Sequence, residues 1–118
     1  MPVRGIRGAT AVKVDSDDAV LAATRELLEK IVAANGVAVD DIASIIFTVT
    51  PDLKSEYPAR AARLLGWTEV ALLGATEMDV AAGLKRCIRV LLHVNTDLPA
   101  SQIKHIYLYE ARALRPDR

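Results

Sequence analysis

The 118-residue sequence predicts a single α+β (α/β-like) domain, residues 1–118, with a mixed sheet of about five strands, one long helix and a short second helix. Only one long segment has apolar residues at helical spacing, whereas several short segments alternate or are continuously apolar, as strands are. The predicted order is strand, helix, strand, short helix, strand, strand, strand. Because one long helix covers only one sheet face, we expect a homo-oligomer to cover the other.

The first strand is predicted in residues 3–12, although two glycines weaken the pattern. Arg7 lies there between small neighbours, which fits either a bound anion or a side chain that extends into solvent. The long helix follows: Asp15 and Ser16 are N-cap candidates, apolar residues recur at helical spacing, and Gly36 ends it.

The middle of the chain alternates strands with a loop and a short helix. Residues 42–50 are apolar enough for a strand buried on both faces. Residues 51–58 contain two prolines and form a loop, which is a common place for functional residues. A short helix is predicted in residues 59–65, with arginines facing solvent, and a short strand in residues 68–73.

Residues 85–95 form the most informative strand, because an arginine stands inside an apolar, β-branched run. Arg89 and Cys87 share one face of it. A buried guanidinium keeps its charge and needs an anionic partner, either a carboxylate of this chain or a ligand, and the residues alone leave both open. Cys87, the only cysteine, forms no intrachain disulfide and is predicted to be a buried small hydrophobe.

The end of the chain is predicted to hold a last strand in residues 103–109 and, from composition, a frayed basic end in residues 112–118. Fifteen basic residues balance fifteen acidic ones, so no overall field favours nucleic acid or an anionic membrane. No apolar run reaches the length of a membrane span and the amino terminus lacks a leader pattern, so we expect a cytoplasmic protein.

The sequence lacks the patterns of several chemistries. His93 and His105 have no metal-ligand spacing, and we predict no metal. There is no glycine-rich phosphate loop, nucleophile-elbow serine or Walker lysine. An enzyme with this inventory would use binding and electrostatics, without a cofactor.

Several motifs, in order along the chain, resemble one known family. They are Val3–Thr10, Thr50–Leu53, Tyr57–Ala59, Glu77–Val80, Cys87–Val90, His105–Leu108 and Leu114–Asp117. Together they resemble the monofunctional trimeric α/β chorismate mutases over essentially the whole chain. The resemblance implies a homotrimer packed as a pseudo-α/β-barrel, with active sites in clefts between adjacent subunits.

The resemblance also implies roles for single residues. Arg89 matches the arginine at the ether oxygen and one carboxylate of chorismate, Arg7 matches a carboxylate-binding arginine, and Glu77 matches the carboxylate that takes the ring hydroxyl. Tyr107 matches a tyrosine on a substrate carboxylate. The other matched positions line or close the pocket: Tyr57, Ala59, Arg63, Leu72, Leu73, Gly74, Leu114 and Arg115. Tyr57 replaces a more usual phenylalanine, and Gly74 stands where cysteine or serine is common.

The implied activity is that of an isomerase of phenylalanine and tyrosine biosynthesis. It converts chorismate to prephenate by an intramolecular [3,3] rearrangement, in which no proton need move. Two alternatives stay open on the sequence: a Rid-type imine or enamine hydrolase, also a small trimer with an interfacial arginine, and a non-catalytic trimer that binds a carboxylate metabolite.

Overall fold

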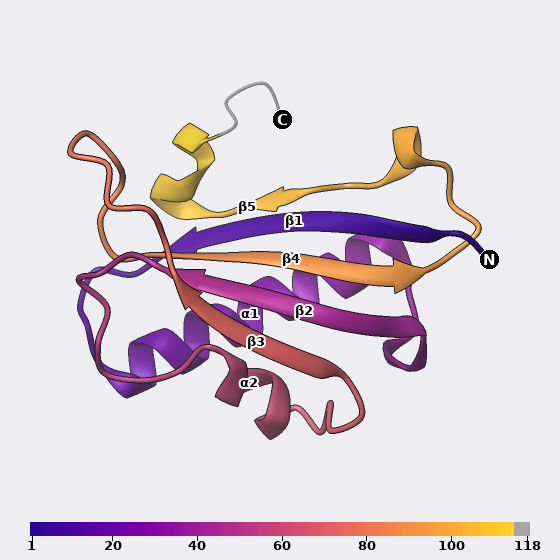
Figure 1. Cartoon of the computed structure of the whole chain (residues 1–118), viewed down its shortest axis with the longest axis horizontal. Coiled ribbons are helices and arrows are strands. Elements are labelled where there is room, and N and C mark those ends of the chain that lie inside the picture. Colours follow the sequence, from indigo (N-terminus) through magenta and orange to yellow (C-terminus); the bar gives the residue numbers. More distant parts are fainter. Residues whose placement is uncertain (115–118) are drawn as a thin grey trace.

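The structure is a computed structural model that describes residues 1–114, and it contains one sheet covered on one face by two helices (Figure 1). The helices are α1 (Asp17–Asn35) and α2 (Ala59–Leu64), with short 3₁₀ helices at Val39–Asp41, Ala100–Gln102 and Tyr109–Leu114. The strands are β1 (Val3–Ala11), β2 (Ile42–Val49), β3 (Ala71–Thr76), β4 (Cys87–Asn95) and β5 (Ile106–Tyr107). The predicted order of elements and the mixed five-stranded sheet are confirmed.

The sheet order is β3-β2-β4-β1-β5, so the strand that carries Arg89 is the central one. Strand β4 pairs antiparallel with β1 and with β2. The outer pairs are parallel, β3 with β2 and β5 with β1. Residues from the middle and the last part of the chain therefore lie beside the first strand.

Local signals explain where α1 begins and ends. The Ser16 hydroxyl accepts a hydrogen bond from the Ala19 N–H at 3.1 Å, and two aspartates in the first turn complement the helix dipole. Gly36 takes a left-handed conformation at φ 59°, and its N–H donates to the Val32 carbonyl. Of the two N-cap candidates, Ser16 is the cap, and Gly36 ends the helix as predicted.

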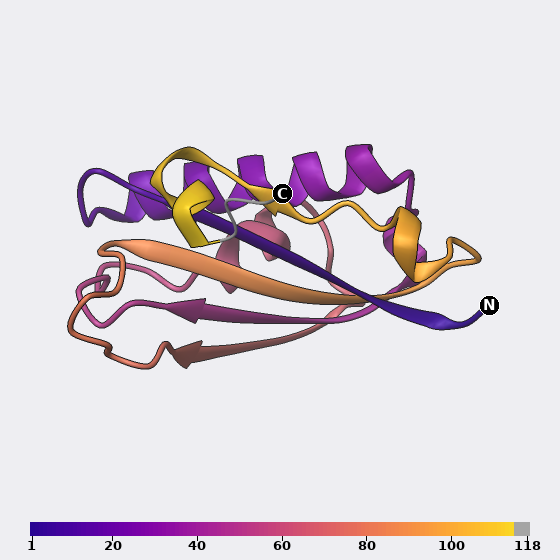
Figure 2. The same ribbon diagram turned by 90° about the horizontal axis from the view of Figure 1, so that it is seen from above.

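The hydrophobic core lies between α1, α2 and the sheet face that they cover. The edge-on view shows both helices on that side of the sheet (Figure 2). Leu27 and Ile31 of α1 are fully buried against it. A Cβ added at Gly8 of β1 would stand 2.8 Å from the Ile31 Cδ1 atom, so a larger residue there would displace core side chains of α1.

The other sheet face, here called the open face, carries no helix of the described residues except at one end. Side chains there include Leu91, which is 37% exposed, and Leu73, which is 63% exposed. Strand β2 is therefore buried on only one face within this chain, contrary to the prediction for residues 42–50. At one end, Ala111 of the last 3₁₀ helix packs on Ala9 and Cys87, which confirms Cys87 as a buried residue.

Several boundaries differ from the sequence prediction; β3, for example, extends to Thr76 and not to residue 73, and β4 starts at Cys87 and not at residue 85. Strand β3 starts at Ala71 and not at residue 68, because Trp67 and Val70 turn into the core before pairing begins. Strand β5 pairs over two residues only. Residues 112–114, predicted to fray, belong to the 3₁₀ helix that the fully buried Ala111 holds down.

No helix within residues 1–114 is both long and apolar enough to cross a membrane.

Candidate active site

Strand pairing places Arg89 and Tyr107 in one row across the open face. Arg89 lies opposite Ala9 of β1, and Ala9 lies opposite Tyr107 of β5. Paired residues point to the same face of a sheet. Because Ala9 between them is small and fully buried, no tall side chain of that row separates the guanidinium from the phenol ring.

The row continues on the other side to Glu77. Arg89 lies opposite Thr48 of β2, whose hydroxyl donates to the Glu77 Oε2 atom at 2.8 Å. The Glu77 backbone N–H donates to the Val49 carbonyl at 2.8 Å, so both its backbone and its carboxylate are held beside β2.

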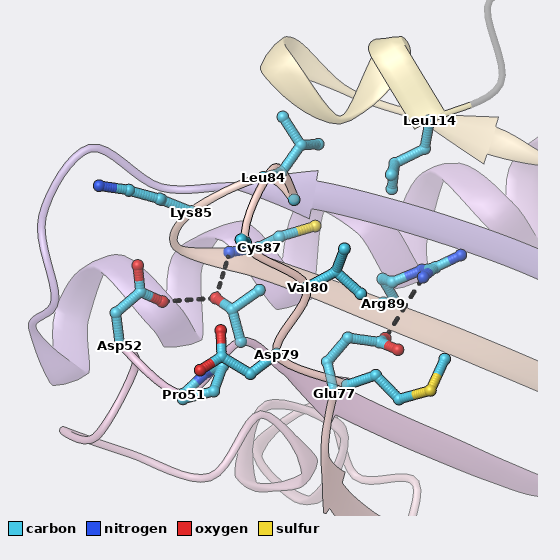
Figure 3. Close-up of a pocket in the computed structure, with 14 residues that line it drawn as sticks. Pro51, Asp52, Glu77, Asp79, Val80, Leu84, Lys85, Cys87, Arg89 and Leu114 are labelled. Carbon is cyan, nitrogen blue, oxygen red and sulfur yellow. Dashed lines mark hydrogen bonds and ion pairs between the residues drawn. The ribbon is translucent and has the colours of Figure 1, made fainter.

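Arg89 and Glu77 form an ion pair, with 3.4 Å between the Nη1 and Oε2 atoms (Figure 3). This distance is long for a charge-assisted hydrogen bond, so the pair is not a tight bidentate fork. The Arg89 side chain remains 42% exposed and the Glu77 side chain 22% exposed. Among residues 1–114, Glu77 is thus the ion-pair partner of Arg89, and the Arg89 guanidinium still faces solvent.

Arg89 and Glu77 line a cavity of about 450 Å³, a volume within the usual range of small-molecule sites. Leu114 of the last 3₁₀ helix points toward it (Figure 3). Its remaining walls come from the ends of β2 and β4 and from the connection after β3; they are Thr50, Pro51, Asp52, Met78, Asp79, Val80, Ala81, Gly83, Leu84, Lys85 and Cys87. The cavity joins segments distant in sequence.

Arg7 lies on the same open face, one pair further along the strands. It is opposite Leu91, which makes it a diagonal neighbour of Arg89. The Arg7 side chain is half-buried, and its backbone N–H donates to the His105 Nδ1 atom at 2.9 Å. Arg7 does not line the cavity of about 450 Å³, but it contributes a second cation to the same face.

A second group of the predicted residues lies elsewhere. Tyr57 and Gly74 line another cavity, of about 460 Å³, together with Phe47 and Leu53. Gly74 pairs with Phe47, which is buried under the helices, and Leu53 packs with Val20 of α1. This second cavity is therefore on the helix-covered side of the sheet, opposite to Arg89.

The remaining predicted residues are spread around that second cavity and the edge strand. Ala59 begins α2 and is buried in the core, while Arg63 is exposed on the same helix. Leu72 is half-buried against the core, and Leu73 is exposed on the open face. Arg115 lies outside the described residues.

The residues that sequence reasoning missed lie mainly in the connection between β3 and β4. Met78, Asp79, Val80 and Lys85 all line the cavity of Arg89. Their place in the chain is the feature that could have identified them as site residues. This glycine-containing connection begins directly after Glu77 and ends directly before the strand of Arg89.

Cys87 also lines this cavity, but its chemistry is that of a neutral thiol. Burial raises the pKa of Cys87 to about 11, although the positive charge of Arg89 acts in the opposite direction. The thiol is protonated at neutral pH and is therefore a poor nucleophile. Across residues 1–114, no three His, Cys, Asp or Glu side chains gather closely enough to hold a metal ion.

Comparisons with known proteins identify the family of the chain. A family model described as chorismate mutase type I matches residues 3–118. The chain is 47% identical over 118 residues to the chorismate mutase AroH of Bacillus subtilis (strain 168), covering 99% of this chain and 93% of that protein. It is 52% identical over 116 residues to the chorismate mutase AroH of Thermus thermophilus, covering 98% and 95%. A solved structure of a chorismate mutase from Clostridium thermocellum has a TM-score of 0.92 and 49% identity, covering 93% of this chain and 98% of that one. The chain belongs to the chorismate mutase type I family.

Proposed function

We propose that this protein converts chorismate to prephenate at sites that two adjacent copies of the chain share in a homotrimer. The observation that carries the proposal is the Arg89–Glu77 pair at 3.4 Å, on the wall of a cavity of substrate size. The pair combines a fixed cation with a fixed hydrogen-bond acceptor on a face that also carries Arg7 and Tyr107.

The reaction breaks a C–O bond and forms a C–C bond within one molecule. Negative charge grows on the ether oxygen in the transition state. The Arg89 guanidinium, placed at that oxygen, stabilises the transition state more than the substrate, which is the condition for catalysis by differential binding. The Glu77 carboxylate, which the Thr48 hydroxyl holds in place, accepts a hydrogen bond from the ring hydroxyl of chorismate.

The other polar groups of the open face hold the substrate in shape. Arg7 and Tyr107 flank the position of Arg89 and bind carboxylate, so that the flexible substrate is kept in its compact reactive form. No step transfers a proton, and no cofactor or metal takes part in this scheme. The cytoplasmic location predicted from the sequence belongs to the same proposal.

The division of the predicted residues between two cavities supports a shared site. Glu77 and Arg89 line the cavity of the open face, whereas Tyr57 and Gly74 line the cavity on the helix-covered side. One chorismate molecule cannot contact residues on both faces of the same sheet. The open apolar face, with Leu91 and Leu73 exposed, also favours assembly of several copies.

The decisive experiment is an assay of chorismate loss with prephenate formation, on the wild type and on Arg89→Lys. Lysine keeps the charge but loses the planar fork, so we expect kcat to fall by about a thousandfold. Arg25→Lys is the matched control, because Arg25 lies in an exposed ion pair of α1 with Glu29. Near-normal kcat in Arg89→Lys would exclude the assigned role.

The dependence of kcat on pH separates this function from the two alternatives. Without proton transfer, kcat is expected to be nearly flat around neutral pH and insensitive to D₂O. An imine hydrolase has to activate water, and would show a bell-shaped profile and activity on an imino acid. A non-catalytic carboxylate binder would leave chorismate unchanged.

A further inference from the structure

A hydrogen-bonded corner joins the end of β2 to the start of β4, immediately before Arg89. We call it the Asp52 corner; it consists of Thr50, Asp52 and Arg86. The Thr50 hydroxyl donates to the Asp52 Oδ1 atom at 2.5 Å and accepts from the Cys87 backbone N–H at 2.9 Å. These two contacts form the chain of dashed lines from Asp52 to Cys87 in Figure 3.

The Asp52 carboxylate also holds the backbone of Arg86. The Arg86 N–H donates to the Oδ2 atom at 2.9 Å and to the Oδ1 atom at 3.1 Å. Arg86 has φ 47°, in the left-handed region that non-glycine residues seldom occupy. Such a conformation persists where surrounding contacts fix it, and the Asp52 carboxylate provides two of them.

A third strand is tied to the same corner. The Arg86 Nε atom donates to the Val12 carbonyl at 3.0 Å, and the Val12 N–H donates to the Arg86 carbonyl at 2.9 Å. The Asp52 corner therefore fixes the turn that feeds β4 relative to both β2 and the end of β1.

Arg89 lies directly downstream of this turn. Cys87 begins β4 and shares the open face with Arg89, two residues further on. A shift of Arg86 moves the start of β4, and a misplacement of about 1 Å in a group that acts on the transition state can lower a rate by roughly a hundredfold.

We infer that Asp52 is a positioning residue for Arg89, acting through the turn at Arg86 and the Thr50 hydroxyl. The inference rests on the proposed function, since it assumes that Arg89 stabilises the transition state. Asp52 is exposed and also lines the cavity. Its negative charge would repel the two carboxylates of chorismate, so it acts on the protein backbone and not on the substrate.

The test compares Asp52→Ala and Asp52→Asn in the full chain, with kcat and KM measured well below the melting temperature of each variant. We expect Asp52→Ala to lower kcat by roughly tenfold to a hundredfold with little change in KM, because the affected interaction is made in the transition state. Asp52→Asn keeps an oxygen for the Arg86 N–H and is expected to lose less. Asp40→Ala, exposed at the other end of β2, is the control and should keep its kcat.

A rescue variant separates positioning from a general loss of stability. Glycine adopts positive φ without support, so adding Arg86→Gly to Asp52→Ala is expected to raise kcat severalfold, up to the value of Arg86→Gly alone, which itself lacks the bond from the Arg86 Nε atom to the Val12 carbonyl. Should Asp52→Ala fail to fold, Thr50→Val removes only the bridging hydroxyl and is expected to lower kcat similarly. Unchanged kcat in Asp52→Ala and in Thr50→Val would overturn the inference, and so would a kcat of Asp52→Ala that neither asparagine at position 52 nor Arg86→Gly raises, the Arg86→Gly single variant serving as the reference for the second comparison.

The Arg89→Lys variant distinguishes failure of this inference from failure of the proposed function. If Arg89→Lys loses activity while Asp52→Ala retains it, only the positioning role is wrong. If Arg89→Lys retains activity, the role of Arg89 itself is wrong, and the inference falls with it.

Discussion

Gly8 shows how closely a single position on β1 is constrained by the helix above it. A Cβ at this position would stand 2.8 Å from the Ile31 Cδ1 atom, 3.1 Å from the Leu27 Cδ1 atom and 3.2 Å from the Val90 Cγ2 atom. These are side-chain ends that can move, but they belong to a packed core. We therefore predict that Gly8→Ala lowers the free energy of unfolding by about 1 to 3 kcal/mol.

Gly5 on the same strand provides the control for Gly8. A Cβ there meets only the Leu91 Cδ1 atom, at the ordinary contact distance of 3.6 Å. Urea unfolding of Gly8→Ala, Gly5→Ala and the wild type at one protein concentration measures the difference. Equal urea midpoints for Gly8→Ala and Gly5→Ala would show that α1 accommodates the added methyl group without loss of stability.

At the scale of elements, Asp15 fastens the loop that carries Tyr57. Its carboxylate accepts hydrogen bonds from the Ser55 hydroxyl at 2.7 Å, the Lys54 N–H at 3.0 Å and the Ser55 N–H at 3.2 Å. The bond from the Ser55 hydroxyl, followed by that from the Lys54 N–H, lowers the pKa of Asp15 below its ordinary value of 3.8. The ionised form therefore favours the folded loop.

This shift predicts a specific dependence of stability on pH. Because the pKa is lower in the folded chain, the contribution of Asp15 is complete above pH 3.8 and is lost as the pH falls through the folded value. The melting temperature of the wild type should exceed that of Asp15→Ala by a constant difference at pH 5 to 8, and this difference should shrink below pH 3.8. A difference in melting temperature that persists well below pH 3.8 would mean that the ionised form of Asp15 is not the source of the stabilisation.

Local signals in the sequence determine where α1 begins and ends, whereas long-range packing determines where β3 begins. The Ser16 cap and Gly36 are next to the helix that they delimit, so both were readable. The sequence predicts the start of β3 too early, because Trp67 and Val70 are apolar like strand residues but pack into the core before the strand begins. The hydrophobic pattern alone does not distinguish apolar residues of a strand from apolar residues of a loop that packs into the core.

The candidate site shows the same division. The sequence of its own strand indicates Arg89 as a candidate, because a cation among apolar residues needs a partner. Its partner Glu77 lies twelve positions earlier, beyond a connection without regular structure, and the two meet because β4 and β3 both pair with β2. Strand order is a property of the whole fold, so only the resemblance to a family linked these residues beforehand.

At the scale of the whole molecule, the two cavities predict a test of the shared site that uses two variants, each expected to be impaired. Arg89→Lys damages the open-face cavity, and Arg63→Ala damages the surface of α2 beside the other cavity. If each site takes one cavity from each of two adjacent subunits, a mixed trimer contains some sites in which both contributing halves are intact.

Random assembly sets the expected recovery. When the two variants are unfolded together in equal amounts and refolded, about one site in four combines an Arg63→Ala subunit that keeps Arg89 with an Arg89→Lys subunit that keeps Arg63. The refolded mixture should thus regain about a quarter of the wild-type kcat/KM. Each variant refolded alone is the control, and should remain as impaired as before. If a single chain supplied the whole site, every site would retain one lesion, and the mixture would be no more active than the average of its parents.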